Sequence, residues 1–160
     1  MRTPDLIIGP RHNPQTLRWH IFKCRGWQLS LHKWMRSDDD RALHDHSGHN
    51  LSIILSRAGY WELVRHRVVV PCPISDKGAW TNVDRWHWRR AWRLYFRRAD
   101  QPHRVALSPG SAPIWTLWLR FPPIREWGFH CPKGWRHWKE YTGNRDYYGV
   151  GESTGGKGCD

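Results

Sequence analysis

Long apolar runs are absent from this 160-residue sequence. A helix that crosses a membrane needs about 18 or more consecutive apolar residues, and no segment approaches that length. The N-terminus carries only Leu6, Ile7 and Ile8 where a secretory signal peptide would have an apolar segment of about 7–15 residues. We therefore expect a cytoplasmic protein with no membrane partner.

Cysteine is scarce as well. The chain has Cys24, Cys72, Cys131 and Cys159, and they form no CxxC pair. A cytoplasm keeps thiols reduced, and an even number of cysteines does not establish pairing. We expect all four to be free thiols.

Acidic residues are few, because 14 Asp and Glu stand against 26 Lys and Arg, for a formal charge of +12. Such a surplus suits nucleic acid or an anionic surface, and it also arises from an arginine-rich composition alone. Seven arginines lie between Arg85 and Arg104, interleaved with Trp86, Trp88, Trp92, Tyr95 and Phe96. This stretch (85–104) is typical either of a groove for single-stranded nucleic acid or, more commonly, of an exposed strand pair whose arginine stems cover aromatic surface.

The remaining acids include a local cluster, Asp38, Asp39, Asp40 and Asp45. The cluster could bind a cation, but a solvated loop that pairs with neighbouring arginines is the simpler interpretation. Asp45 lies between two histidines, so it either orients an imidazole or faces outward beside Arg41.

Aromatic residues, in contrast, are abundant, with 13 Trp, 5 Tyr and 4 Phe. Disordered chains have few aromatic residues, so we expect a folded protein. A chain of this length can bury one hydrophobic core without the stabilisation of a metal ion or a disulfide. The rings could fill that core or form the interface of a homodimer.

Short segments of alternating polarity, separated by Gly, Pro, Asp and Ser, predict strands. They are residues 28–35, 51–55, 60–64, 67–70, 92–97 and 114–119. Helical signals are few, with one short helix or strand expected at 135–141. Many short strands with regular turns favour an antiparallel sandwich or barrel.

We expect one domain over residues 1–148, followed by a flexible, glycine-rich tail over 149–160. The tail contains a GxxxxGK match at 151–157. Gly158 replaces the hydroxyl residue that would hold magnesium, and no helix follows, so we expect no nucleotide binding there.

The candidate chemistry lies in an H-x-H motif, His44 and His46, directly before the predicted strand 51–55. Residues i and i+2 of a strand face the same side, so both imidazoles can point at one ion. A third imidazole, His103, begins another predicted strand after a turn.

These two segments resemble the two motifs of the cupin superfamily, H-x-H followed by Glu and later Gly, and P-x-G-x-x-H. His44, His46 and His103 occupy the three histidine positions, and Pro102 matches a common proline. A wider likeness to small cupin-like proteins of bacteria and phages runs through SDDDRALHDH, RRADQPHR and REWGFHCPKGWRHW. The resemblance implies an all-β fold, a single cupin-like barrel (double-stranded β-helix or jelly-roll) with little helix.

The sequence departs from this pattern at the carboxylate ligand, where Asn50 stands. Three neutral imidazoles remain, with His49 or Asn50 as candidate fourth ligands. Such a set resembles that of cupin thiol dioxygenases and implies Fe(II), with Zn, Ni, Cu or Mn as alternatives. Zinc would instead favour hydrolysis.

The resemblance therefore implies an Fe(II) oxygen-dependent oxidoreductase of dioxygenase type that acts on a small anionic substrate, because neutral ligands leave the charge of the ion uncompensated. The candidate substrate contacts are Tyr60, Arg98 and Trp127, and the sequence identifies no catalytic acid or base. The alternative is a non-catalytic cupin module that binds nucleic acid through the stretch 85–104.

Overall fold

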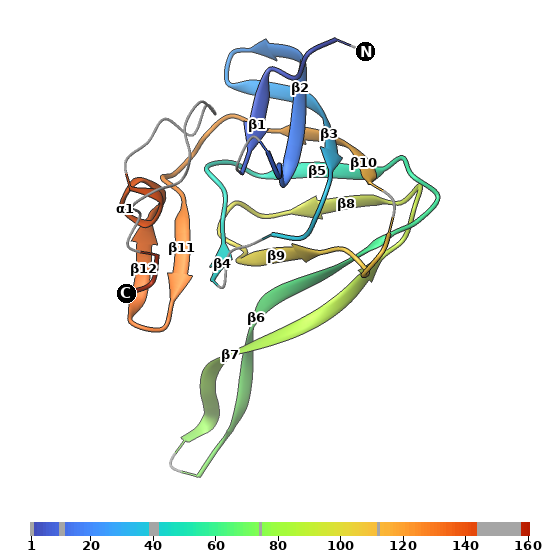
Figure 1. Cartoon of the computed structure of the whole chain (residues 1–160). Coiled ribbons are helices and arrows are strands. Elements are labelled where there is room, and N and C mark those ends of the chain that lie inside the picture. Colours follow the sequence, from blue (N-terminus) through green and yellow to red (C-terminus); the bar gives the residue numbers. More distant parts are fainter. Residues whose placement is uncertain (1, 10–11, 39–41, 74, 112, 144–157) are drawn as a thin grey trace.

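Two antiparallel sheets form the fold (Figure 1). The computed structural model describes residues 2–9, 12–38, 42–73, 75–111, 113–143 and 158–160. In spatial order, the first sheet holds β1 (Leu6–Ile8), β2 (Thr16–Cys24), β3 (Trp27–Trp34), β10 (Ile114–Arg120), β5 (Asn50–Ile54) and β8 (Leu94–Arg97). The second holds β12 (Gly134–His137), β11 (Gly128–Cys131), β4 (Leu43–His44), β9 (His103–Ala106), β6 (Tyr60–Cys72) and β7 (Ser75–Arg89). The all-β prediction is confirmed.

Most predicted strands are present with shifted ends. The segments 28–35, 51–55 and 114–119 correspond to β3, β5 and β10, and the segments 60–64 and 67–70 join into β6. The segment 92–97 becomes a strand only at Leu94, because Trp92 adopts a left-handed backbone with φ of 60°. The segment 135–141 is divided between β12 and the helix α1 (Trp138–Thr142). Among the described residues, no helix is long and apolar enough to span a membrane.

The interior of the barrel is unusually polar. On β3 the buried positions are Gln28, Ser30 and His32, whereas the intervening Leu29 and Leu31 are half-buried. An apolar cluster of Ile54, Tyr60, Val105 and Ile114 fills only part of the interior. Burying polar groups costs free energy unless they are paired. The polar part of the interior is therefore the place to expect a functional site.

Two of the four cysteines correct the free-thiol expectation. Cys131 on β11 and Cys159 form a disulfide, while Cys24 and Cys72 are free thiols. The bond joins residues 28 positions apart that the fold brings together, which spacing in the sequence does not reveal. The N–H of Gly158 also donates to the carbonyl of Tyr141. Residues 158–160 are thus attached to the barrel, and the rest of the predicted tail, with the GxxxxGK match, lies outside the described residues.

A long hairpin of β6 and β7 extends away from the barrel (Figure 1). β9 pairs with β6 only from Trp61 to Val64. Beyond that point, the described part of β6 pairs with β7 alone. We call residues 65–72 and 75–84 the hairpin arm. Among the described residues of the arm, Arg67, Val69 and Trp80 are exposed.

Candidate metal centre

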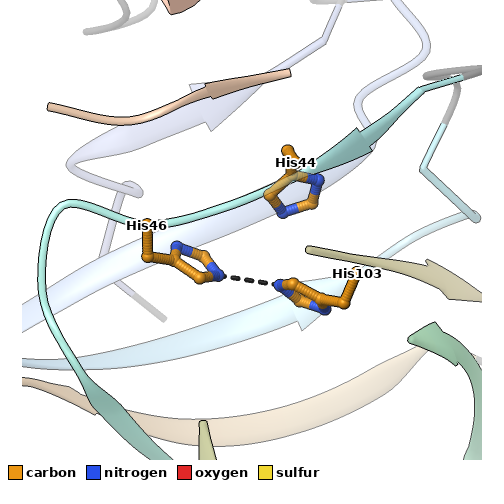
Figure 2. A group of neighbouring side chains, drawn as sticks. All are labelled: His44, His46 and His103. Atoms are coloured by element: carbon orange, nitrogen blue, oxygen red, sulfur yellow. Dashed lines mark hydrogen bonds between the residues drawn. The ribbon is translucent and has the colours of Figure 1, made fainter. Parts of the chain in front are cut away.

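The three predicted histidines meet inside the barrel. Antiparallel pairing of β4 with β9 sets His44 directly opposite His103, so their side chains share a face. His46 follows two residues after His44, and its Nε2 lies 2.8 Å from Nε2 of His103 (Figure 2). One ring nitrogen from each histidine lies within 4.8 Å of the other two. Two distant segments of the chain therefore converge on one point.

A buried carboxylate, Glu62, contacts the third histidine from behind. Its Oε1 lies 2.7 Å from Nδ1 of His103, and its side chain is fully buried. Glu62 pairs with Val105 between β6 and β9, which places it on the same inner face as His103. A proton shared between Nδ1 and this carboxylate leaves the Nε2 lone pair directed at the other two rings. Sequence reasoning missed Glu62, although its alternation with Tyr60 and Val64 marks an inward position.

Glu62 is itself held by two arginines. Nε of Arg89 donates to it at 2.5 Å, and Arg97 reaches it from β8 on the opposite sheet. Arg97 also donates to Oδ1 of Asn50 at 3.1 Å. Burial alone would raise the pKa of Glu62, but Arg97, His103 and Arg89 outweigh burial and lower it below its usual range. Glu62 is therefore a fixed negative charge behind His103.

Two of the three histidines, His46 and His103, are neutral in this environment. Burial lowers the pKa of His103 to about 3, and burial together with the neighbouring rings lowers the pKa of His46 well below its ordinary value. Neutral imidazole is the form that binds metals. Because nitrogen–metal bonds are about 2.0–2.1 Å long, the nitrogen ligands of one ion lie a little over 3 Å apart; in this cluster one pair is 2.8 Å apart and none is more than 4.8 Å apart, so small side-chain movements would suffice. The residues fit a mononuclear metal ion.

The two candidate fourth ligands, His49 and Asn50, form hydrogen bonds with other residues of the protein. Nδ1 of His49 accepts a hydrogen bond from the backbone N–H of Ala99 at 3.0 Å. Oδ1 of Asn50 accepts from Arg97. His49 is not in the cluster of donor atoms within 4.8 Å of one another. The cluster among the described residues thus consists of three histidines, and the role of His49 or Asn50 as a fourth ligand stays a prediction.

Only one of the three candidate substrate contacts lies on the inner face of the barrel. Tyr60 is buried two residues before Glu62, and burial raises the pKa of its hydroxyl to about 12. Arg98 is exposed and paired with Asp100 at 2.8 Å, because its neighbour Arg97 takes the inward position on β8. The role given to Arg98 is corrected accordingly.

Trp127, the third candidate contact, packs outside the histidine cluster. Its ring stacks on Trp138 with centroids 5.7 Å apart, and it also lies against Phe129. These rings pack with the disulfide around a second apolar cluster. In this structure Trp127 supports the β11–α1 region.

The expected solvated acidic loop is also corrected. Asp38 is buried and accepts hydrogen bonds from the N–H of Val105 and from Gln15. Asp45 is buried on the outer side of β4, away from the three histidines. It accepts from Arg125, Trp135 and the N–H of Gly128, and it lies 3.0 Å from Nε2 of His130. Asp39 and Asp40 lie outside the described residues.

Replacing Asp45 by Asn is expected to lower the free energy of unfolding by about 2 kcal/mol, because an amide cannot accept all of these donors. The loss should be seen in urea unfolding monitored by circular dichroism, whereas Asp100→Asn, in an exposed pair, should change the free energy of unfolding by less than about 1 kcal/mol.

Hydrogen bonds outweigh burial and lower the pKa of Asp45 in the folded state. The unfolded state then binds more protons, so the contribution of Asp45 is lost as the pH falls below its unfolded pKa. Equal effects of the two substitutions would contradict this account.

Comparison with known proteins supports the fold. No protein-family model matches the sequence, and no protein of curated function does. The structure resembles Fe(II) HppE in complex with substrate (9% identity, TM-score 0.53, covering 75% of this chain and 57% of that one). It also resembles Fe(II) HppE with the alternative substrate (S)-1-HPP. That match has 10% identity and a TM-score of 0.52, and it covers 76% of this chain and 59% of that one. A provisionally named mannose-6-phosphate isomerase from Ralstonia eutropha JMP134 matches with 12% identity and a TM-score of 0.48, over 71% of this chain and 91% of that one.

The chain thus spans less than three fifths of the length of the HppE chains. At about 10% identity these likenesses show the fold and nothing finer. The fold is a cupin-like jelly-roll barrel.

Proposed function

We propose that this cupin-like barrel binds one Fe(II) ion through His44, His46 and His103 and oxidises a small anionic substrate with molecular oxygen. The observation that carries the proposal is the convergence of three histidine ring nitrogens, one of them on a ring that the buried Glu62 contacts. A ligand set of three imidazoles leaves positions for substrate and oxygen, and iron would supply the redox chemistry. HppE, whose barrel is similar, holds Fe(II) in the two structures compared above.

Positive charge near the cluster favours an anionic substrate. After burial and the neighbouring rings, the charges of Arg97 and Arg18 lower the pKa of His46 further, which indicates a positive potential at this ring. The Arg18 guanidinium lies 5.0 Å from the centroid of Trp118, and that ring lies 6.2 Å from the His46 ring. Arg18 and His46 thus both lie beside the Trp118 ring, and Arg18 is the best candidate to orient a carboxylate or phosphonate.

Glu62, Arg97 and Tyr60 would have different roles at this site. Glu62 keeps His103 in one orientation, and Arg97 holds Glu62 from the opposite sheet, so the geometry of the site depends on both sheets. The hydroxyl of Tyr60 stays protonated at neutral pH and can donate a hydrogen bond. The roles of these residues are therefore to hold the metal ligand and to orient the substrate.

Anaerobic reconstitution tests the proposal. Protein prepared without chelator and incubated with Fe(II) under argon should contain about one iron per chain by elemental analysis. Addition of nitric oxide should give the electron paramagnetic resonance signal of a high-spin iron nitrosyl, which reports an open coordination position. Stoichiometric zinc that Fe(II) does not replace would support hydrolytic chemistry instead, and protein that binds no metal would contradict the proposal.

A further inference from the structure

One face of the second sheet collects exposed tryptophans. Strand alternation and the pairing of β6 with β7 put four rings on the side that points away from the barrel interior. Their exposed fractions are 43%, 63%, 48% and 41% for Trp61, Trp80, Trp86 and Trp88, respectively. Four large rings exposed on one face mark a binding surface rather than a chance distribution.

Arginines lie between these rings on the same face. The guanidinium of Arg67 lies 4.9 Å from the centroid of Trp80, and that of Arg104, on β9, lies 5.7 Å from Trp86. Arg104 pairs with Leu63 in the register of β9 and β6, which confirms the shared face. We call Trp61, Trp80, Trp86, Trp88, Arg67 and Arg104 the tryptophan face. Cations and ring surfaces thus alternate over it.

A cavity of mixed polar and apolar lining adjoins this face where the hairpin arm leaves the barrel. Its volume is about 530 Å³, and Arg67 and Asn82 of the arm contribute to its wall. The other wall includes Gln101 and His130. His130 pairs with Leu43 and so points outward, on the same side as the tryptophans. Hydrogen-bond donors of both walls, together with Asp100, whose charge Arg98 compensates, therefore line a space large enough for one nucleotide.

We propose that the tryptophan face binds single-stranded nucleic acid. Bases stack on exposed rings, and phosphates pair with the arginines between them, whereas the paired bases of a duplex do not offer their faces. The chain's charge of +12 favours a polyanion and opposes a second copy of the same basic face. A membrane is disfavoured because the Arg65–Asp84 ion pair lies within the face and would have to be desolvated.

The proposed surface differs from the sequence stretch 85–104. Within that stretch, Trp86, Trp88 and Arg104 lie on the tryptophan face, but Arg97 is buried inside the barrel. Phe96 belongs to the first sheet. The face instead gains Trp61, Trp80 and Arg67, which lie outside the stretch.

The test measures fluorescence anisotropy of a labelled 20-nucleotide oligothymidylate with the full chain. Binding is expected to weaken as salt increases, and Trp80→Ala and Trp86→Ala should each weaken it about tenfold. Trp80→Phe should retain most of the affinity, because it keeps a ring for stacking. Trp27→Ala, which removes a partly exposed tryptophan from the first sheet, is the matched control and should change little.

The arginines have a separate readout. Arg67→Ala should reduce the slope of log affinity against log salt by about 0.7, the value for one phosphate of a single strand. Lys133→Ala, in the exposed turn between β11 and β12, should leave the slope unchanged. All of these variants should keep the metal content of the parent protein, so this test is independent of the metal centre.

Three results would overturn the proposal. Equal binding of a duplex, with Trp80→Ala and Trp86→Ala without effect, would show attraction by net charge alone. Tighter binding to vesicles of phosphatidylglycerol and phosphatidylcholine than to the oligonucleotide would assign the face to a membrane. Concentration-dependent dimerisation that Trp80→Ala abolishes, without oligonucleotide binding, would assign it to a second copy of the chain.

Discussion

His103→Ala is expected to lower the affinity for Fe(II) by more than about 100-fold and to abolish any oxygen-dependent activity. Loss of a group that merely orients a ligand costs about 10–100-fold in metal affinity, and loss of the ligand itself costs more. His44 and His46 alone would leave two imidazoles, which hold an ion less firmly than three. The measurement is a competition titration with a chromophoric chelator under argon, together with metal analysis after gel filtration.

The control for this substitution is another histidine of the same sheet. His66 lies on the hairpin arm, where its Nε2 is 2.9 Å from Nε2 of His87, outside the three-histidine cluster. His66→Ala should bind Fe(II) like the parent protein. Glu62 keeps its two arginines when the imidazole of His103 is removed, so the variant should fold, which circular dichroism verifies. Stoichiometric iron in folded His103→Ala would exclude this centre.

Only the part of the site that depends on alternation along one strand, the pair His44 and His46, could be predicted from the residues alone. His44 and His46 share a side because they are two residues apart, and that relation is independent of the rest of the fold. His103 joins them because β4 pairs with β9, a long-range contact that only the resemblance to a known family suggested. Glu62 was missed for the same reason, since its position beside His103 depends on the register of β6 and β9.

Alternation also explains why Arg98 was chosen in place of Arg97. The two residues are neighbours with opposite orientations, and the choice between them requires the direction of the barrel interior. Hydrophobicity gives the wrong direction in this barrel. On β3 it would place Leu29 and Leu31 inside, whereas the structure buries Gln28, Ser30 and His32. In a barrel whose interior holds a polar site, polar residues can face the interior, so apolar residues do not by themselves identify the core.

The disulfide shows a different limit. The prediction of free thiols followed from the expected compartment and from the absence of a CxxC pair, and neither reports contacts between distant residues. The pairing of Cys131 with Cys159 depends on where the end of the chain lies, next to β11. No local pattern carries that information.

Glu62→Gln is expected to cost about 3–5 kcal/mol of the free energy of unfolding, because it removes the charge that compensates the buried Arg97 while keeping the shape of the side chain. Arg97 is 7% exposed and Arg89 is 23% exposed, so water compensates the loss only in part. The same substitution should weaken Fe(II) binding by about 10–100-fold, since an amide no longer holds the His103 ring as a carboxylate does. Urea unfolding and the chelator titration measure the two effects separately.

The contrast with an exposed ion pair makes the Glu62 prediction decisive. Asp84→Asn removes a carboxylate from the pair with Arg65, where both side chains remain about one third exposed, and it should cost no more than about 1 kcal/mol and leave iron affinity unchanged. Because Glu62 both neutralises Arg97 and positions His103, a second substitution that also removes the arginine, Arg97→Met, should restore stability but not iron affinity. Restoration of both would show that Glu62 has no part in positioning His103, whereas restoration of stability alone separates its two roles. Because Arg97 comes from one sheet and Glu62 from the other, the second outcome would also mean that closure of the barrel and orientation of the metal ligand depend on the same carboxylate.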